Sequence, residues 1–380
     1  MRLVGDWIGN PGTQALCVAL ENSGHRALFV GGCVRNAVMG LPVADIDIAT
    51  DAHPKKVSII AQNAGMRVIP TGLDHGTLTV ISGGVPHEVT TFRRDVETDG
   101  RHAIVAFSDQ VEDDAARRDF TMNALYADRT GAVIDPLNGL PDVLARRVRF
   151  VGDAGARIAE DYLRILRFFR FYAHYGDPTL GIDAEGLAAC ASFSAGIETL
   201  SRERIGAEMR KFLGAPDPAP AAASMAQSGV LAVIVPGADV RALAPLVHLE
   251  KGRAPRWLRR LAVLGGQNLS DRLRLSRREA SDLARVRNEI NQMQGAAATG
   301  FVLGEILGAD ALLARAALLE QSLPTSWESD LLRGAAAVFP VQAADLLDRV
   351  QGPALGAALN AARKRWLESD LTLTREQLLA

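Results

Sequence analysis

Residues 27–49, which read ALFVGGCVRNAVMGLPVADIDIA, contain the pattern from which we predict the fold. The apolar run at 27–31 stops at a pair of glycines, which indicates a short strand that ends in a tight turn. Residues 45–49 alternate between polar and apolar, which predicts a second strand with one face in a core. Because side chains two positions apart leave the same face of a strand, Asp45 and Asp47 should point the same way.

Two neighbouring carboxylates repel each other and normally need a cation between them. Oxygen ligands without histidine or cysteine suit Mg²⁺ or Mn²⁺. The glycines before this pair would let backbone N–H groups approach a phosphate, and Arg35 could add a bidentate positive charge. For the two aspartates alone, a solvated strand edge is the simpler explanation. The presence of both features within seventeen residues favours a phosphate and metal site.

The next segment predicts a hairpin, and the remainder of the chain predicts helices. Residues 78–81 and 85–92 are β-branched runs separated by a Ser-Gly-Gly turn, and Glu88 lies on the second run. From Ala145 onward alanine, leucine and arginine recur at helical spacing. The three prolines of residues 214–220 predict a linker. We therefore predict an α+β fold, in which an N-terminal mixed sheet with helices is followed by an all-α C-terminal region.

The composition fits a globular protein with more than one structural unit. The chain has 380 residues, of which 48% are hydrophobic and 23% charged, and this length exceeds what one core usually serves. No run approaches the roughly 20 apolar residues that span a bilayer, and the three cysteines are scattered. We therefore expect a cytoplasmic protein with no membrane association and no stable protein partner.

The charge of the chain is unevenly distributed. The net charge of −2 argues against a general nucleic-acid binder, yet residues 253–287 contain ten arginines and only three acidic residues. Such a cluster can form a phosphate-binding face. From charge alone, solvated arginine-rich helices are the simpler explanation.

Five motifs, taken in order, resemble those of the class II tRNA nucleotidyltransferases and bacterial poly(A) polymerases. They are the glycine turn with its DxD pair, a loop containing Gly-Arg, an RRD motif, an EDxxR motif and a helix-stabilising motif, at residues 31–47, 95–107, 117–125, 160–164 and 201–205. Asn36 departs from the family, which usually has aspartate at this place. Because an amide still accepts a hydrogen bond but brings no charge, we expect the turn to survive and Arg35 to lose one possible partner.

The resemblance implies three regions and a set of site residues. The regions are a palm-like nucleotidyltransferase head, a helical neck that selects the base, and a helical body and tail that bind tRNA, at residues 1–143, 144–214 and 215–380. Asp45 and Asp47 would hold two Mg²⁺ ions, with Glu88 as a third catalytic carboxylate. The nucleotide would be bound at its triphosphate by Gly32 and Arg35, at its ribose by Arg118 and Asp119, and at its base by Asp161 and Arg164.

The EDxxR residues can also be understood from chemistry alone. Adenine and cytosine present an amine beside an unprotonated ring nitrogen, whereas guanine and uracil present a carbonyl beside a ring N–H. Since aspartate accepts and arginine donates, Asp161 and Arg164 together would match A and C and reject G and U. Apolar residues at helical spacing predict one helix over 158–172. Arg167 and Arg170 on this helix are candidates for triphosphate contacts.

We therefore expect an enzyme that adds C, C and A to the 3′ end of tRNA from CTP and ATP and releases pyrophosphate. The alternatives are a bacterial poly(A) polymerase, a partial enzyme adding only CC or only A, an inactive RNA-binding relative, and a small-molecule nucleotidyltransferase. Residues 70–80 resemble the CCA-adding branch, which disfavours the polymerase. The tRNA would be recognised by shape, and the candidate surface consists of Arg259, Arg260, Arg277 and Arg278.

Overall fold

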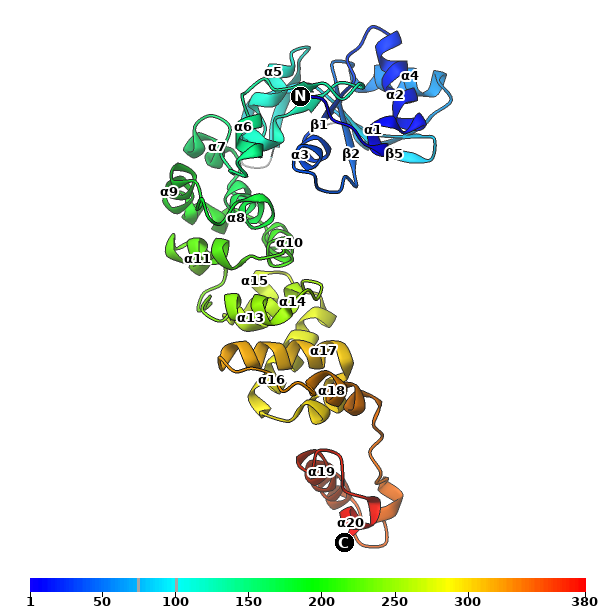
Figure 1. Ribbon diagram of the computed structural model, residues 1–380, viewed down its shortest axis with the longest axis vertical. Coiled ribbons are helices and arrows are strands. Elements are labelled where there is room, and N and C mark those ends of the chain that lie inside the picture. Colours follow the sequence, from blue (N-terminus) through cyan, green and yellow to red (C-terminus); the bar gives the residue numbers. More distant parts are fainter. Residues whose placement is uncertain (74–75, 100–101) are drawn as a thin grey trace. The chain divides into compact units, whose positions relative to one another are not determined.

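The computed structural model describes residues 1–73, 76–99 and 102–380. Within these residues, every strand precedes residue 135 and the later elements are helices (Figure 1), which confirms the predicted fold class. Seven strands form one mixed sheet, in the spatial order β3 (Arg67–Gly72), β4 (Thr77–Ser82), β5 (Val85–Thr91), β2 (Ile46–Thr50), β1 (Leu28–Val30), β8 (Tyr126–Ala127) and β9 (Val133–Ile134).

Two motifs of the sequence fall partly outside the described residues. The segment that resembles the CCA-adding branch includes Asp74 and His75, and the Gly-Arg loop includes Gly100 and Arg101; these four residues are not described. Around the second gap, the backbone forms an antiparallel pair of strands, β6 (Arg93–Asp99) and β7 (His102–Phe107).

The strands that carry the predicted carboxylates lie side by side in the sheet. β2 pairs with β1 in antiparallel and with β5 in parallel orientation. β4 and β5 form the predicted hairpin, and its turn contains Gly83 and Gly84 with φ values of 57° and 81°. Residues other than glycine rarely adopt such angles, so the Ser-Gly-Gly sequence determines this turn. The two predicted strands and the hairpin are thus confirmed.

Helices and a buried apolar cluster support this sheet. α2 (Pro11–Asn22) and α4 (Pro54–Asn63) pack against each other and against β4. On the strands, Leu28, Val30 and Ala49 join Phe92 and Tyr126 in a core cluster. The other helices of the first 200 residues are α1 (Asp6–Gly9), α3 (Gly32–Val38), α5 (Val111–Ala116), η2 (Thr121–Asn123), α6 (Leu140–Leu144), α7 (Ala154–Glu160), α8 (Leu163–Tyr175), α9 (Ala184–Ser192) and η3 (Ser194–Thr199).

The EDxxR motif lies across two helices instead of within one. α7 ends at Glu160, Asp161 is extended with φ −158°, and α8 begins at Leu163. The Asp161 carboxylate accepts a hydrogen bond from the backbone N–H of Leu163 at 3.1 Å, so it caps α8. The prediction of one helix over 158–172 is therefore wrong. The apolar residues keep their helical spacing across this cap, so the sequence pattern did not indicate the break between the two helices.

The chain divides into two compact units. The first contains Met1–Leu200 with Gln227–Val233, and the second contains Ser201–Ala226 with Ile234–Ala380. The first unit therefore includes residues 144–200 of the predicted neck. The division into head, neck, and body with tail stays a prediction.

The C-terminal half of the chain is helical. α10 ends at Leu213 and α11 begins at Ala219, so residues 214–218 connect the two helices, whereas Ala219 and Pro220 of the predicted linker already belong to α11. Among the described residues, no helix combines the length and apolar character needed to cross a bilayer. In chain order the elements after residue 200 are α10 (Arg202–Leu213), α11 (Ala219–Gln227), α12 (Val230–Ile234), α13 (Leu243–Glu250), α14 (Trp257–Leu264), α15 (Leu269–Arg272), α16 (Arg277–Gln292), α17 (Ala296–Leu318), α18 (Trp327–Ala336), η4 (Ala343–Leu346), α19 (Pro353–Glu368) and α20 (Arg375–Leu379).

Candidate active site

Three carboxylates lie on one face of the sheet. Asp45 precedes β2 and is exposed, and Asp47 lies on β2 and is half-buried. In the parallel register of β2 and β5, Asp47 is the direct partner of Glu88. Because directly paired residues and residues two apart share a face, the structure places all three acidic groups together, as predicted.

The electrostatics of Asp47 reflect this crowding. Burial raises the pKa of Asp47 to about 6, and the neighbouring carboxylates of Glu88 and Asp45 add to this rise, whereas Arg118 opposes it. A group with such a raised pKa favours a bound positive charge when it is ionised.

The donor chemistry of this face fits Mg²⁺. In the described part of the chain, no three His, Cys, Asp or Glu side chains are grouped so that they could hold a metal ion by themselves. Mg²⁺ is commonly held by one or two carboxylates together with water and substrate phosphates. Asp45 and Asp47 supply two carboxylates of this kind on an open face.

The glycine turn lies next to Arg118, whose guanidinium is bound by Asp114 and Tyr126. Gly31, with φ 70°, precedes α3, and a Cβ there would lie 3.3 Å from Arg118 Nη1. Arg118 Nη2 donates to Asp114 at 2.9 Å, and its Nε donates to the Tyr126 hydroxyl at 3.1 Å. A side chain at position 31 would therefore crowd the Arg118 guanidinium.

Asp114 is a site-supporting residue that the sequence reasoning missed. Its carboxylate binds Arg117 and Arg118 and accepts from the Tyr126 hydroxyl at 2.7 Å. Burial alone would raise the pKa of Asp114, but the two guanidinium groups outweigh it and lower the pKa to about 2. The available signal was the spacing of three and four residues between Asp114 on α5 and the two arginines that follow this helix.

Arg35 is buried and makes several contacts within the first unit. Its Nη2 donates to Asn36 Oδ1 at 2.9 Å and its Nη1 donates to Asn123 Oδ1 at 2.5 Å. The expected loss of a partner at Asn36 is therefore wrong, since the amide oxygen still accepts from Arg35, although without a charge. A Cβ on Gly32 would meet only Arg35 Nη2, at 4.0 Å, so the predicted triphosphate residues are neighbours.

Three arginines gather around the ring of Phe171 on α8. The guanidinium carbons of Arg35, Arg167 and Arg170 lie 5.2, 5.4 and 4.6 Å from the ring centre. Arg167 also donates from Nε to Asp119 at 2.8 Å. This cluster brings together positive charges from α3 and α8, a distribution that suits a polyphosphate.

Asp119 and the EDxxR residues are already engaged in hydrogen bonds. Asp119 is buried and accepts from Arg167 and from Asn123, the latter at 2.8 Å. Arg164 pairs with Glu160 and donates to the Arg157 carbonyl at 2.8 Å. Asp161 and Arg164 are both half-buried at the junction of α7 and α8, so this junction brings the two predicted base-selecting residues together.

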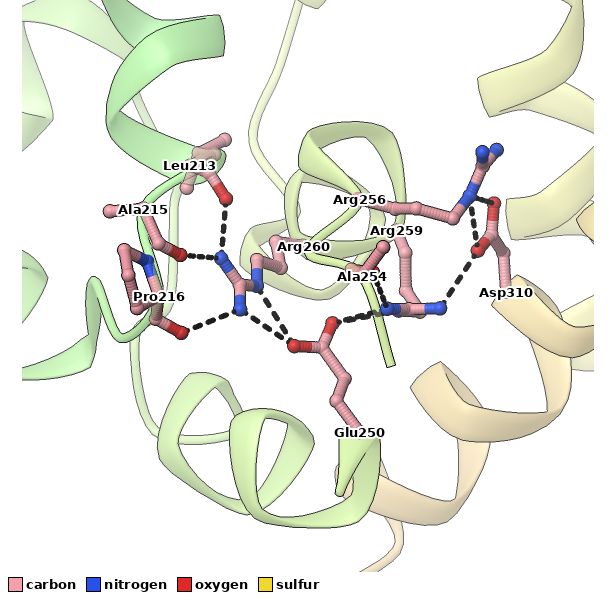
Figure 2. A network of polar contacts seen from close by, with 9 residues as sticks. All are labelled: Leu213, Ala215, Pro216, Glu250, Ala254, Arg256, Arg259, Arg260 and Asp310. Atoms are coloured by element: carbon pink, nitrogen blue, oxygen red, sulfur yellow. Dashed lines mark hydrogen bonds and ion pairs between the residues drawn. The ribbon is translucent and has the colours of Figure 1, made fainter. Parts of the chain in front are cut away.

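Two members of the predicted tRNA surface are buried in the second unit (Figure 2). The side chains of Arg259 and Arg260 are only 3% and 1% exposed, and both pair with Glu250. Arg259 also pairs with Asp310, to which Arg256 donates at 2.9 Å. The prediction that Arg259 and Arg260 contact tRNA is therefore wrong, because their guanidinium groups are buried and bound to partners inside the second unit.

Arg260 uses its remaining donors to bind the linker. Its Nη1 donates to the carbonyls of Leu213, at 2.7 Å, and Ala215, and its Nη2 donates to the Pro216 carbonyl at 3.0 Å (Figure 2). These carbonyls belong to the last residue of α10 and to the residues after it, where helical partners are missing. The other two members of the predicted surface, Arg277 and Arg278, are exposed at the start of α16.

Comparisons with known proteins agree with this arrangement. Residues 27–149 match the poly A polymerase head domain, and residues 180–241 match the probable RNA and SrmB-binding site of polymerase A. The chain is 31% identical over 389 residues to the mitochondrial CCA tRNA nucleotidyltransferase 1 of Danio rerio, covering 97% of this chain and 90% of the relative. The human counterpart is 42% identical over 203 residues, covering 53% of this chain and 47% of the relative, so that match spans about half of each.

A solved structure extends the similarity to the fold. The crystal structure of the Bacillus stearothermophilus CCA-adding enzyme in complex with CTP has 27% sequence identity and a TM-score of 0.74, and the match covers 97% of this chain and 96% of that one. The ordered motifs, the carboxylate face and these near full-length matches lead to one conclusion: the chain belongs to the family of CCA-adding tRNA nucleotidyltransferases.

Proposed function

We propose that this protein adds C, C and A to the 3′ end of tRNA, using CTP and ATP. In each step the terminal ribose hydroxyl of the RNA attacks the α-phosphate of the nucleotide. A bond forms between that oxygen and phosphorus, the bond to the β-phosphate oxygen breaks, pyrophosphate leaves, and the hydroxyl proton passes to a base. The observation that carries the proposal is the face shared by Asp45, Asp47 and Glu88 beside Arg118 and the glycine turn.

The acidic face would hold the metal and receive the attacking hydroxyl. Asp45 and Asp47 would bind Mg²⁺, with two ions expected, and Glu88 would stand beside them as the third carboxylate. When bound, Mg²⁺ stabilises negative charge at the α-phosphate and favours ionisation of the attacking hydroxyl. The carboxylates themselves would orient the reacting groups.

The arginines would bind the nucleotide. Gly32 and Arg35, together with Arg167 and Arg170, would receive the triphosphate, since their charges already converge near Phe171. Arg118 and Asp119 would hold the ribose. Asp161 and Arg164 at the α7–α8 junction would read the base, because one accepts and the other donates along the pairing edge of C or A.

The RNA would be bound through its phosphates and shape, and we infer a contact from the exposed start of α16. Arg277 and Arg278 are exposed there, and the Arg278 side chain is 93% accessible. Of the four arginines in the predicted tRNA surface, these two remain candidates, because Arg259 and Arg260 are buried. The cytoplasmic location expected from the sequence stays a prediction.

A tail-addition assay tests the proposed function. The protein is incubated with a tRNA transcript that lacks its CCA end, together with Mg²⁺, CTP and ATP, and the products are resolved at single-nucleotide resolution. We expect extension that stops after CCA. A long run of A would instead indicate the poly(A) polymerase alternative, and omission of CTP or ATP in turn would reveal a CC-only or A-only enzyme. No extension under any of these conditions would contradict the proposal.

A further inference from the structure

Asn123 connects two parts of the candidate site, although no motif assigns it a role. It ends η2 and is buried. Its Oδ1 accepts from Arg35 Nη1 at 2.5 Å, and its Nδ2 donates to Asp119 Oδ1 at 2.8 Å. A single amide therefore contacts one positive and one negative group.

The bonds continue in both directions to separate helices. Arg35 lies on α3, directly after the glycine turn, while Asp119 accepts from Arg167 on α8 at 2.8 Å. The sequence of contacts Arg35–Asn123–Asp119–Arg167, which we call the relay, thus joins α3 to α8. Every link is directional, unlike the stacking of Arg35 on the Tyr175 ring of α8 at 3.9 Å.

The chemistry of the relay requires an amide at position 123. Arginine can only donate, and an ionised aspartate can only accept. Burial raises the pKa of Asp119, but Arg167 and the hydrogen bond from Asn123 outweigh it and lower the pKa, so this carboxylate is ionised at neutral pH. The group between Arg35 and Asp119 must therefore accept on one side and donate on the other, which asparagine does.

We propose that Asn123 is a positioning residue that fixes the base-reading helix α8 relative to the triphosphate-binding turn before α3. The inference rests on the proposed function, because the two ends of the relay are the proposed triphosphate and base sites. If a nucleotide is anchored by its phosphates, its base edge can be recognised only when Arg164 on α8 stays at a constant distance from the triphosphate-binding turn. Loss of the relay therefore reduces base discrimination more than it reduces the rate with the correct nucleotide.

Two variants and a matched control separate this role from general stability. Asn123→Leu removes both bonds at similar size. Asn123→Asp keeps the contact with Arg35 but places a second carboxylate against Asp119, and it remains available if the leucine variant does not fold. The control is Thr121→Val in the same turn, where the buried hydroxyl donates to Asp142 at 2.7 Å, outside the relay.

The test combines hydrogen exchange with nucleotide kinetics. We expect faster amide exchange along α8 in both Asn123 variants, together with a fall of about tenfold in the preference for CTP over UTP, the size expected when a hydrogen bond to a charged group is lost. Thr121→Val should change neither quantity. Equal α8 exchange and equal preference in the Asn123 variants and the control would overturn the relay. If the parent protein incorporates no nucleotide, the proposed function fails, and α8 exchange alone then decides the relay.

Discussion

Guanidinium groups define the site at the level of single residues. Arg118 is held by Asp114 and Tyr126 so that one end reaches the glycine turn, and Arg167 is held by Asp119. Fixed arginines lose little freedom when a substrate binds, which is a general source of affinity and rate. Asp114 therefore contributes to the geometry of the site by holding Arg118.

The lowered pKa of Asp114 predicts how stability depends on pH. Because the folded-state pKa is about 2 and the ordinary value for aspartate is 3.8, the ionised group stabilises the fold by about 2 kcal/mol. This contribution is complete above the unfolded pKa and is lost as the pH falls through the folded pKa. We expect Asp114→Asn to lower the free energy of urea unfolding at neutral pH, with a smaller difference from the parent near about pH 3. A difference that does not change with pH would contradict this.

Local spacing predicted that Asp45 and Asp47 share a face, the family resemblance supplied their roles and that of Glu88, and neither predicted the residues that support the site. Asp45 and Asp47 are two positions apart at the start of β2, so the two-residue period of a strand predicts that they share a face. Asn123 was part of a recognised motif, yet its bonds to Arg35 and Asp119 depend on η2, α3 and α8 coming together. No pattern within one segment contains that information.

At the scale of elements, the junction between α7 and α8 places the two residues that are proposed to read the base. Asp161 leaves the helical conformation and caps α8, and Arg164 lies in the first turn that follows. The cap fixes the direction of α8, while the pairing edge of the base would contact the same junction. Asp161 thus has a structural and a proposed recognition role.

Substitution at this junction should relax base selection. We expect Asp161→Ala to increase the relative incorporation of UMP over CMP by about tenfold or more, because a half-buried acceptor that opposes the wrong base is lost. Asp183→Ala provides the matched control, since Asp183 also caps a helix, with a 2.8 Å bond to the N–H of Gly186. Competition assays with mixed nucleotides give both ratios. The same selectivity in Asp161→Ala and the parent would refute base reading by this residue.

The network around Glu250 stabilises the second unit from within. Glu250 bridges Arg259 and Arg260, and Arg260 binds carbonyls at and after the end of α10 (Figure 2). Removing one partner of a buried ion pair leaves the other charge unpaired, which typically costs about 3–5 kcal/mol. We expect a loss of this size in the free energy of unfolding for Glu250→Gln, measured with urea. Arg278→Met, at a side chain that is 93% exposed, should have almost no effect; equal losses in the two variants would contradict the role of the network.

The burial of Arg259 and Arg260 could not have been predicted from the sequence. Glu250 and Asp310 lie nine to about fifty residues from the arginines that they bind, so the cluster looked like a basic surface. The strands and the hairpin were predictable because alternation and the Ser-Gly-Gly turn are local signals. The helix break at Asp161 was missed because Ile158 and Ile165 are both buried on either side of it.

At the scale of the whole molecule, the two units have separate proposed tasks. The first unit contains the carboxylate face, the arginine cluster and the base-reading junction, and the second contains the exposed start of α16. A protein with a net charge of −2 must concentrate its RNA contacts locally, since its overall field does not attract a polyanion. Salt dependence is therefore the appropriate probe of these contacts.

Removing the two exposed arginines should weaken RNA binding through its electrostatic part. We expect Arg277→Gln combined with Arg278→Gln to raise the Kd for tRNA and to reduce the slope of log Kd against log salt by about one for each RNA phosphate that is no longer neutralised. Lys56→Gln is the control, because Lys56 is exposed on α4 and lies outside both the 253–287 cluster and the 180–241 segment. An unchanged slope in the double variant would exclude the start of α16 from the RNA interface.

The most direct test of the proposed metal-binding face compares single-turnover CMP incorporation by the parent, Asp47→Asn and Asp51→Asn on tRNA lacking its CCA end. Asp51 follows β2 but lies 3.4 Å from His25, away from the acidic face. We predict that Asp47→Asn lowers the rate by about 10²-fold or more, the scale for losing one electrostatic group at a reaction centre, with tRNA affinity unchanged and Asp51→Asn close to the parent. Incorporation by Asp47→Asn at a rate similar to that of the parent would contradict the catalytic role of this face.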